Sequence, residues 1–294
     1  MSLLRDNVNS GPSDLRSQMR DFVVSAGVFN GISALIAQRA GFRSAYLSGS
    51  GIAGAMGLPD LSVTTLTEVS TEVRRIVSVA KIPLIVDIDT GFGEAINVIR
   101  TIREMENAGA SAIHMEDQVL PKRCGHLSGK SVIASSDMVK KIKAAVSARK
   151  NPDFVIIART DARSVNGLED AISRANEYVE AGADAIFSEA LESREEFLKF
   201  SREVKAPLMA NMTEFGRSPL LSVDELRSIG YKMVIFPLTA FRAVLKNMDS
   251  IYRKLYSAGT QRDFMDSILS RKEFYDIIGY SEYEDEDRIL GTEE

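Results

Sequence analysis

One short motif occurs twice in the chain and constrains the fold more than any other feature. Residues 108–116 read AGASAIHME, residues 181–189 read AGADAIFSE, and residues 40–46 form a looser copy. In each copy a helical pattern ends at a glycine, which suits the left-handed backbone of a helix C-terminus, and a short apolar strand follows. Repeated helix-to-strand units indicate an α/β fold with a parallel sheet and helices outside it.

Short β-branched or apolar runs predict further strands, and amphipathic stretches between them predict helices. The strands are expected at residues 22–24, 44–47, 84–87, 112–116, 154–159, 185–188, 208–211 and 233–236. The helices are expected at residues 32–40, 66–80, 96–108, 136–148, 168–181, 195–203 and 223–229. This number of repeated units favours a closed (β/α)8 TIM barrel over an open sheet, and the site of such a barrel lies at the C-terminal ends of its strands.

Residues 238–258 and 264–278 predict additional helices with no strand after them. A closed eight-stranded barrel does not need these helices, so we expect them to pack against a neighbouring subunit. The acidic tail, residues 282–294, has few apolar residues and predicts partial disorder. We therefore expect a catalytic barrel over residues 1–258 and a helical extension over residues 259–294.

The composition narrows the possible partners and compartment. A net charge of −5 argues against nucleic acid and anionic membranes as partners, because both require a concentrated basic patch. The single cysteine excludes an intrachain disulfide and suits a reducing compartment. No apolar run approaches the ~20 residues that span a bilayer, and the first residues lack the apolar centre of a secretion signal. We expect a cytoplasmic enzyme.

Four acidic residues follow two neighbouring predicted strands. Asp87 ends the third strand with Asp89 two residues beyond it, and Glu116 ends the fourth with Asp117 directly after it. At one barrel mouth their carboxylates would repel one another unless a cation lay among them or some bound protons. Because Mg2+ prefers hard oxygen ligands, the pattern predicts a magnesium site. The alternative is that these acids cap helices or form ion pairs in the loops.

The next loop, PKRCGHLSGK at residues 121–130, carries the only cysteine of the chain. A cysteine of ordinary pKa, about 8.5, can act as an acid at neutral pH or, when activated, as a nucleophile. A lone cysteine is often an inert buried side chain, but a polar loop after a strand end favours the functional interpretation of Cys124. His126 alone is a weak candidate. His114 is in phase with Glu116, so an interior structural role and a functional role both stay open.

Polar groups also follow the later strands. Arg159 follows the fifth strand, Glu189 the sixth, and the seventh runs into NMTEFG at residues 211–216. An arginine at a strand end suits the two-point binding of a carboxylate. Arg242 and Arg271 are weaker candidates, because helical arginines usually lie on the surface.

Residues 49–54, GSGIAG, match the dinucleotide-binding pattern and follow a strand. That function requires a helix to begin at the turn. Pro59 follows closely and is expected to interrupt any such helix. The sequence therefore argues against a dinucleotide site.

Together these motifs resemble the isocitrate lyase and phosphoenolpyruvate mutase superfamily, and within it the 2-methylisocitrate lyases. The resemblance extends from about Gly27 to about Tyr283. It rests on SGSG at 48–51, GLPD at 57–60, DIDTGFG at 87–93, EDQ at 116–118, KRCGH at 122–126 and NMTEFG at 211–216. The cysteine loop favours the lyases over the phosphonate-forming mutases, which lack it. The chain also has no room for the insertion that lengthens isocitrate lyases.

The resemblance implies that Asp87 and Asp89 hold Mg2+, directly or through water, with Mn2+ as a possible substitute. Asp60 and Glu116 would form the outer shell of that ion. The implied substrate contacts are Ser48, Gly49, Ser50, Gly125, Arg159, Glu189, Asn211, Thr213, Arg242 and Arg271, with Cys124 beside them. The resemblance also implies a homotetramer of barrels that exchange a terminal helix.

The implied reaction is the cleavage of 2-methylisocitrate to pyruvate and succinate, a step of propionate catabolism through the methylcitrate cycle. Cys124 would donate a proton, Tyr46 is the candidate base or proton relay, and Lys122 and His126 are further catalytic candidates. One alternative is a related lyase or hydrolase acting on isocitrate, 2,3-dimethylmalate or oxaloacetate. The other is a barrel that binds an organic acid without catalysis.

Overall fold

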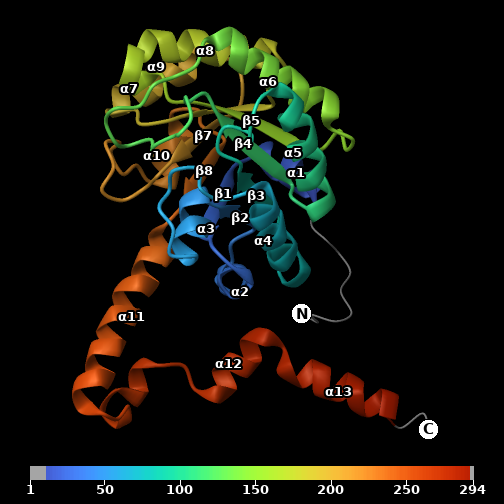
Figure 1. The fold of residues 1–294 in the computed structure, drawn as a ribbon, viewed down its shortest axis with the longest axis vertical. Helices are drawn as coiled ribbons and strands as arrows, with labels where there is room; N and C mark the ends of the chain where they lie inside the picture. Colours follow the sequence, from blue (N-terminus) through green and yellow to red (C-terminus); the bar gives the residue numbers. More distant parts are fainter. Residues whose placement is uncertain (1–10, 292–294) are drawn as a thin grey trace.

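The computed structural model describes residues 11–291 and confirms the closed barrel (Figure 1). Its eight parallel strands follow one another in chain order, and the last pairs with the first. The strands are β1 Val23–Val28, β2 Ser44–Leu47, β3 Leu84–Asp87, β4 Ala112–Glu116, β5 Val155–Thr160, β6 Ala185–Ser188, β7 Leu208–Asn211 and β8 Met233–Phe236.

Helices surround the barrel on its outer face (Figure 1). The predicted ones are found within one or two residues of their expected bounds: α2 Gly31–Arg39, α4 Leu66–Val79, α5 Ala95–Ala108, α6 Ser135–Ala148, α8 Leu168–Glu180, α9 Arg194–Glu203 and α10 Val223–Ser228. Local signals define their ends. Thr65 and Glu68 form a reciprocal capping box at the start of α4. Gly109 ends α5 with a φ of 92°, as the repeated glycine predicts.

Two apolar layers hold the barrel together. One lies between the strands and the surrounding helices. The other fills the barrel interior and includes Tyr46, Ile85 and Phe187. Leu15 and Met19 of helix α1 (Pro12–Met19), which the sequence did not predict, belong to this interior cluster.

Two local predictions were wrong. The first strand runs over Val23–Val28 rather than 22–24, because its second half consists of small residues that give no strand signal. A helix does begin within the glycine-rich motif, namely α3, Gly49–Ala55, and it ends before Pro59. The helix that a dinucleotide site requires is therefore present. That interpretation is excluded by topology instead, since a closed barrel lacks the switch point of a doubly wound sheet.

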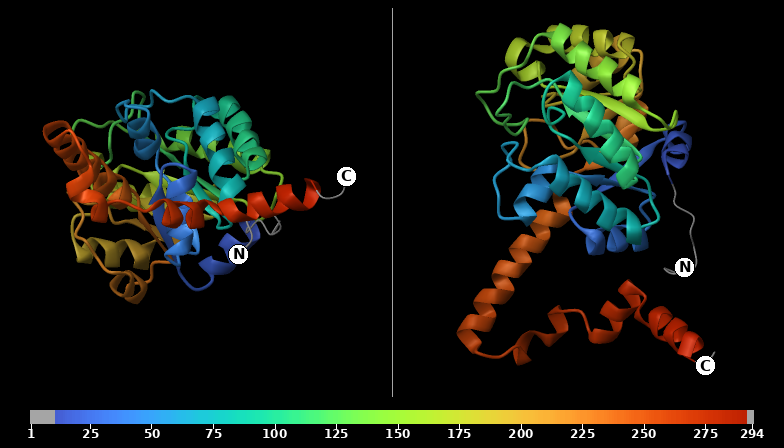
Figure 2. Two further views of the ribbon diagram at one scale, coloured as in Figure 1. Left: turned by 90° about the horizontal axis from the view of Figure 1, so that it is seen from below. Right: turned by 45° about the vertical axis from the view of Figure 1, so that its right-hand side comes forward.

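The chain continues after β8 into an arm that leaves the barrel (Figures 1 and 2). The arm comprises α11 (Thr239–Ala258), the short helix η1 (Arg262–Ser267), α12 (Arg271–Ile278) and α13 (Tyr280–Gly291). The predicted helix over 264–278 is therefore split, and Ser270 caps its second part. The tail is helical as far as Gly291, so disorder was the wrong prediction there; residues 292–294 lie outside the described range.

The arm contains no buried residue in this single chain. Large apolar side chains along it are exposed: Val244, Leu245, Met248, Tyr252, Leu255, Tyr256, Met265, Ile268, Leu269, Phe274, Tyr280, Tyr283, Ile289 and Leu290. So many exposed large apolar side chains on one segment are characteristic of a protein interface. Within residues 11–291, no helix combines the length and apolar character that a bilayer span requires.

Candidate active site

The barrel interior contains a polar chain formed by three neighbouring strands. The hydroxyl of Tyr46 on β2 lies 2.7 Å from Nε2 of His114 on β4. The same nitrogen lies 3.5 Å from Oδ1 of Asp87 on β3. Burial lowers the pKa of His114 to about 4, against the opposing charge of Asp87, so the ring is neutral at pH 7. Burial and Asp87 both raise the pKa of Tyr46 well above its usual value.

Asp87 and Asp89 meet beside the start of helix α3. The Gly49 amide donates to Asp87 Oδ2 over 3.0 Å. A methyl group at residue 49 would lie 3.1 Å from that oxygen and 3.3 Å from Asp89 Oδ1, so only glycine lets the backbone approach both acids without crowding. Burial would raise the pKa of Asp87, but His114, Lys122 and Arg159 lower it to about 2. Asp87 therefore presents ionised oxygen to the barrel mouth, whereas burial raises the pKa of its neighbour Asp89.

Lys122 reaches this acidic pair from the cysteine loop. Its ammonium lies 2.9 Å from Asp89 Oδ1 and also pairs with Asp60. Burial would lower the pKa of Lys122, but the surrounding carboxylates, Glu116 foremost, raise it well above its usual value. Among residues 11–291, no three acidic, histidine or cysteine side chains converge as a complete metal-ligand group. Any cation held by the pair would therefore need oxygen from substrate or water to complete its coordination.

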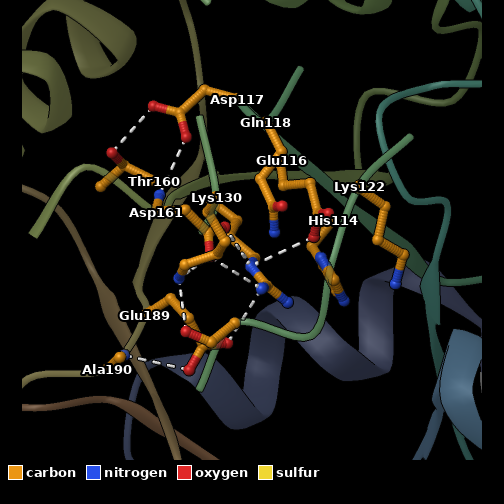
Figure 3. A network of polar contacts seen from close by, with 12 residues as sticks. His114, Glu116, Asp117, Gln118, Lys122, Lys130, Thr160, Asp161, Glu189 and Ala190 are labelled. Carbon is orange, nitrogen blue, oxygen red and sulfur yellow. Dashed lines mark hydrogen bonds and ion pairs between the residues drawn. The ribbon is translucent and has the colours of Figure 1, made fainter. Parts of the chain in front are cut away.

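Glu116 and Asp117 separate to opposite faces of the sheet (Figure 3). Glu116 is fully buried; neither of its oxygens accepts a hydrogen bond from a described residue, although Arg159 Nε lies 3.2 Å from Oε2. Asp117 instead accepts from Thr160 Oγ1 and from Tyr178 Oη on helix α8. The prediction that four acids share one mouth was thus wrong for Asp117. Successive strand residues face opposite ways, so Asp117 anchors a helix to the sheet.

Arg159 is the centre of a buried charge cluster. Its guanidinium binds Asp161 through two hydrogen bonds of 2.9 and 3.1 Å. Nη2 also lies 3.2 Å from Glu189 Oε2, and Asn211 Nδ2 lies 3.3 Å from the same oxygen. Burial would raise the pKa of Glu189, but Arg159 and His126 lower it. The cluster brings three predicted substrate contacts together.

The Cys124 loop, residues 122–130, lies over this cluster. A methyl group at Gly125 would come within 2.4 Å of Glu189 Cγ and 2.5 Å of Arg159 Nη2, so the loop backbone rests directly on both side chains. His126 Nε2 lies 2.8 Å from Glu189 Oε1. Cys124 itself is half-buried and forms no disulfide. Cys124 therefore lies on a loop at the edge of the charged mouth.

The loop after β7 completes the rim. The main-chain amide of Arg217 donates to His126 Nδ1 over 3.0 Å, which leaves Nε2 to carry the ring proton; Nε2 lies 2.8 Å from Glu189 Oε1 but outside hydrogen-bonding geometry. Arg242 Nη1 donates to Glu214 Oε2 over 2.7 Å and lies 3.5 Å from Thr213 Oγ1. The two loops therefore meet at His126.

The remaining predicted site residues fall into two groups, one at the barrel mouth and one on the arm. Ser48 and Gly49 are buried at the start of α3, and Ser50 is half-buried beside them. Arg271 does not join the site of its own chain, because it begins α12 on the arm. The sequence interpretation did not single out Lys130, Asp161 or Gln118. Gln118 forms two hydrogen bonds with the main chain of Arg123 and so holds the start of the Cys124 loop. In the sequence, only its position directly after Glu116 and Asp117 could have indicated a role at the site.

A closed (β/α)8 barrel with acids, a thiol and arginine at its C-terminal mouth has the architecture of a barrel enzyme. The phosphoenolpyruvate phosphomutase family model matches residues 14–256. A 2-methylisocitrate lyase of Aeropyrum pernix is 57% identical over 92% of this chain and 87% of its own. One of Escherichia coli is 48% identical over 88% of each chain.

Solved structures of related enzymes have the same fold as this chain. A crystal structure of 2,3-dimethylmalate lyase has a TM-score of 0.90 at 34% identity, covering 95% of both chains. A phosphonopyruvate hydrolase complexed with oxalate and Mg2+ has a TM-score of 0.84 at 30% identity, covering 96% of this chain and 97% of the other. The chain belongs to the isocitrate lyase and phosphoenolpyruvate mutase superfamily, and it is an enzyme of the carbon–carbon lyase type.

Proposed function

We propose that this enzyme cleaves 2-methylisocitrate to pyruvate and succinate in a Mg2+-dependent reaction. The observation that carries the proposal is the position of Cys124, the only thiol, on a loop that rests on Arg159 and Glu189. The names of the similar curated proteins support this substrate. In metabolism the reaction would serve the methylcitrate cycle in the cytoplasm.

The residues present fit a magnesium ion. Asp87 and Asp89 offer adjacent buried carboxylates, Gly49 leaves space beside them, and Glu116 has two buried oxygens without a hydrogen bond among the described residues. We assign Asp87 and Asp89 as ligands and Asp60 and Glu116 as outer-shell groups. When bound, the ion would act as a Lewis acid for the substrate hydroxyl and the adjacent carboxylate. Mn2+ is proposed as a substitute.

The side chains suit the two proton transfers of the cleavage. Tyr46 keeps its own proton because its pKa is raised, so it would take the proton of the substrate hydroxyl only as a relay that passes its own proton to His114. Arg159 binds a substrate carboxylate and stabilises the charge that develops on the succinate fragment. Cys124 then delivers a proton to that carbanion. Lys122 organises the acidic residues, and His126 positions Glu189 against the loop.

We assign the remaining substrate contacts to the rim of the mouth: Ser48, Gly49, Ser50, Gly125, Glu189, Asn211, Thr213 and Arg242. Arg271 would enter from a second copy. The exposed apolar arm supports this arrangement, which we propose as a homotetramer exchanging terminal helices, with the barrel over residues 1–258 and the extension over 259–294. Mixing Arg271→Met and Cys124→Ser chains tests it: mixed oligomers should recover activity that neither variant has alone, and unchanged inactivity after subunit exchange would contradict it.

A panel of acids tests the substrate. The purified chain with Mg2+ should form pyruvate and succinate from 2-methylisocitrate faster than it cleaves isocitrate, 2,3-dimethylmalate or oxaloacetate. Glyoxylate formation from isocitrate at a higher kcat/KM would overturn the proposed substrate. Binding of these acids without turnover of any would indicate a catalytically silent barrel.

A further inference from the structure

Lys130 lies at the end of the Cys124 loop and has no place in the chemistry described above. Its side chain is 1% exposed, although lysine is rarely buried without a partner. Its ammonium makes two contacts, one to the carbonyl oxygen of Gly125 and one of 2.7 Å to Asp161 Oδ1. Figure 3 shows Lys130 beside Asp161 and Glu189. The buried ammonium therefore connects the loop to the barrel.

Both ends of this connection belong to the proposed site. Gly125 directly follows Cys124, and the amide of Leu127 donates to the Cys124 carbonyl over 2.9 Å, so Gly125 lies inside a tight turn. The Gly125 carbonyl accepts from Lys130 within that turn. Fixing this carbonyl fixes the turn that carries the thiol.

Asp161 is a rigid anchor for the other end. It is fully buried, and its amide donates to Asp117 Oδ1 over 2.8 Å (Figure 3). Its two carboxylate oxygens accept from both Arg159 and Lys130. One carboxylate thus orients the substrate-binding arginine and holds the loop ammonium.

We propose that Lys130 is a positioning residue that couples the placement of Arg159 to closure of the Cys124 loop. Through Asp161, the ammonium aligns the turn carrying Cys124 with the guanidinium that holds the substrate. Opening the loop would separate Lys130 from the Gly125 carbonyl or from Asp161 and leave a buried charge without its partner, which disfavours the open state. This inference rests on the proposed function of Cys124 and Arg159.

The test uses Cys124 as its own reporter, because it is the only thiol in the chain. Iodoacetamide labelling of full-length enzyme is followed with Mg2+, with and without saturating pyruvate plus succinate. Wild-type enzyme should be protected by these acids. Lys130→Met should lose that protection, and its kcat should fall ~10²-fold, as a displacement of about 1 Å does, while KM changes less than kcat. Lys140→Met is the matched control, because Lys140 is exposed and pairs only with Asp137 among described residues.

A stability measurement separates positioning from simple unfolding. Urea unfolding of Lys130→Met shows whether the barrel stays folded, and the proposal requires thiol protection to be lost in the folded variant. Asp161→Asn weakens the anchor shared by Arg159 and Lys130 and should lose protection as well. Wild-type protection and kcat in the folded Lys130→Met enzyme would overturn the proposal, as would wild-type protection in Asp161→Asn. Absence of both turnover and protection in the wild type would instead refute the proposed function.

Discussion

Gly125→Ala tests how closely the Cys124 loop must approach the charged cluster. The new methyl group would lie 2.4 Å from Glu189 Cγ and 2.5 Å from Arg159 Nη2. Carbon atoms pack at ~3.5 Å or more, so the loop would have to retreat by about 1 Å. Arg159 cannot move aside readily, because Asp161 and Glu189 hold it in place.

A displacement of this size near the reacting atoms costs ~10²-fold in rate, or about 2.7 kcal/mol in the activation free energy. We expect kcat for pyruvate release to fall by this factor, with unfolding little changed because the loop lies at the barrel mouth. Pyruvate is followed continuously with lactate dehydrogenase and NADH. Leu127→Ala is the control, since that loop side chain is 59% exposed. A kcat within about threefold of wild type for Gly125→Ala would refute the close-contact argument.

Three further predictions concern the Tyr178–Asp117 hydrogen bond, the pH dependence of stability and the metal requirement. Tyr178→Phe removes the 2.8 Å hydrogen bond to Asp117 and should lower the free energy of unfolding in urea by about 1.5–3 kcal/mol; a stability equal to that of wild type would contradict it. Glu189 is buried, which would raise its pKa, but Arg159 and His126 lower it. The ionised Glu189 carboxylate therefore stabilises the fold above its unfolded pKa of about 4.3, and this stabilisation is lost as pH falls. The stability difference between wild type and Glu189→Gln should shrink below about pH 4, and a constant difference would refute this. EDTA should abolish turnover and added Mg2+ should restore it, with full activity in EDTA as the contrary result.

The strands were predictable from sequence because buried parallel strands form short apolar runs between turn signals. Where that signal is weak, as at Ser25, Ala26 and Gly27 of β1, the prediction stopped early. Asp117 was misplaced although strand alternation could have separated it from Glu116. The prediction treated both as one cluster because they are adjacent in sequence, while their side chains face opposite sides of the sheet.

The individual site residues were predictable, but their contacts were not. Strand ends placed Asp87, Glu116 and Arg159 at one mouth, because all parallel strands end there. The contact of Lys130 with Asp161 joins residues on different loops, and no local pattern reports such a pairing. Arg271 shows a different limit, because it begins α12 on the arm, away from the mouth of its own barrel.

Cys124→Ser tests the central claim most directly. The claim is that the only thiol of the chain is the acid that protonates the succinate fragment. With saturating Mg2+ and 2-methylisocitrate, loss of a general acid should lower kcat by about 10²–10⁴-fold, while the variant keeps its fold and its affinity for pyruvate plus succinate. A kcat that stays within about tenfold of wild type would contradict the role of Cys124.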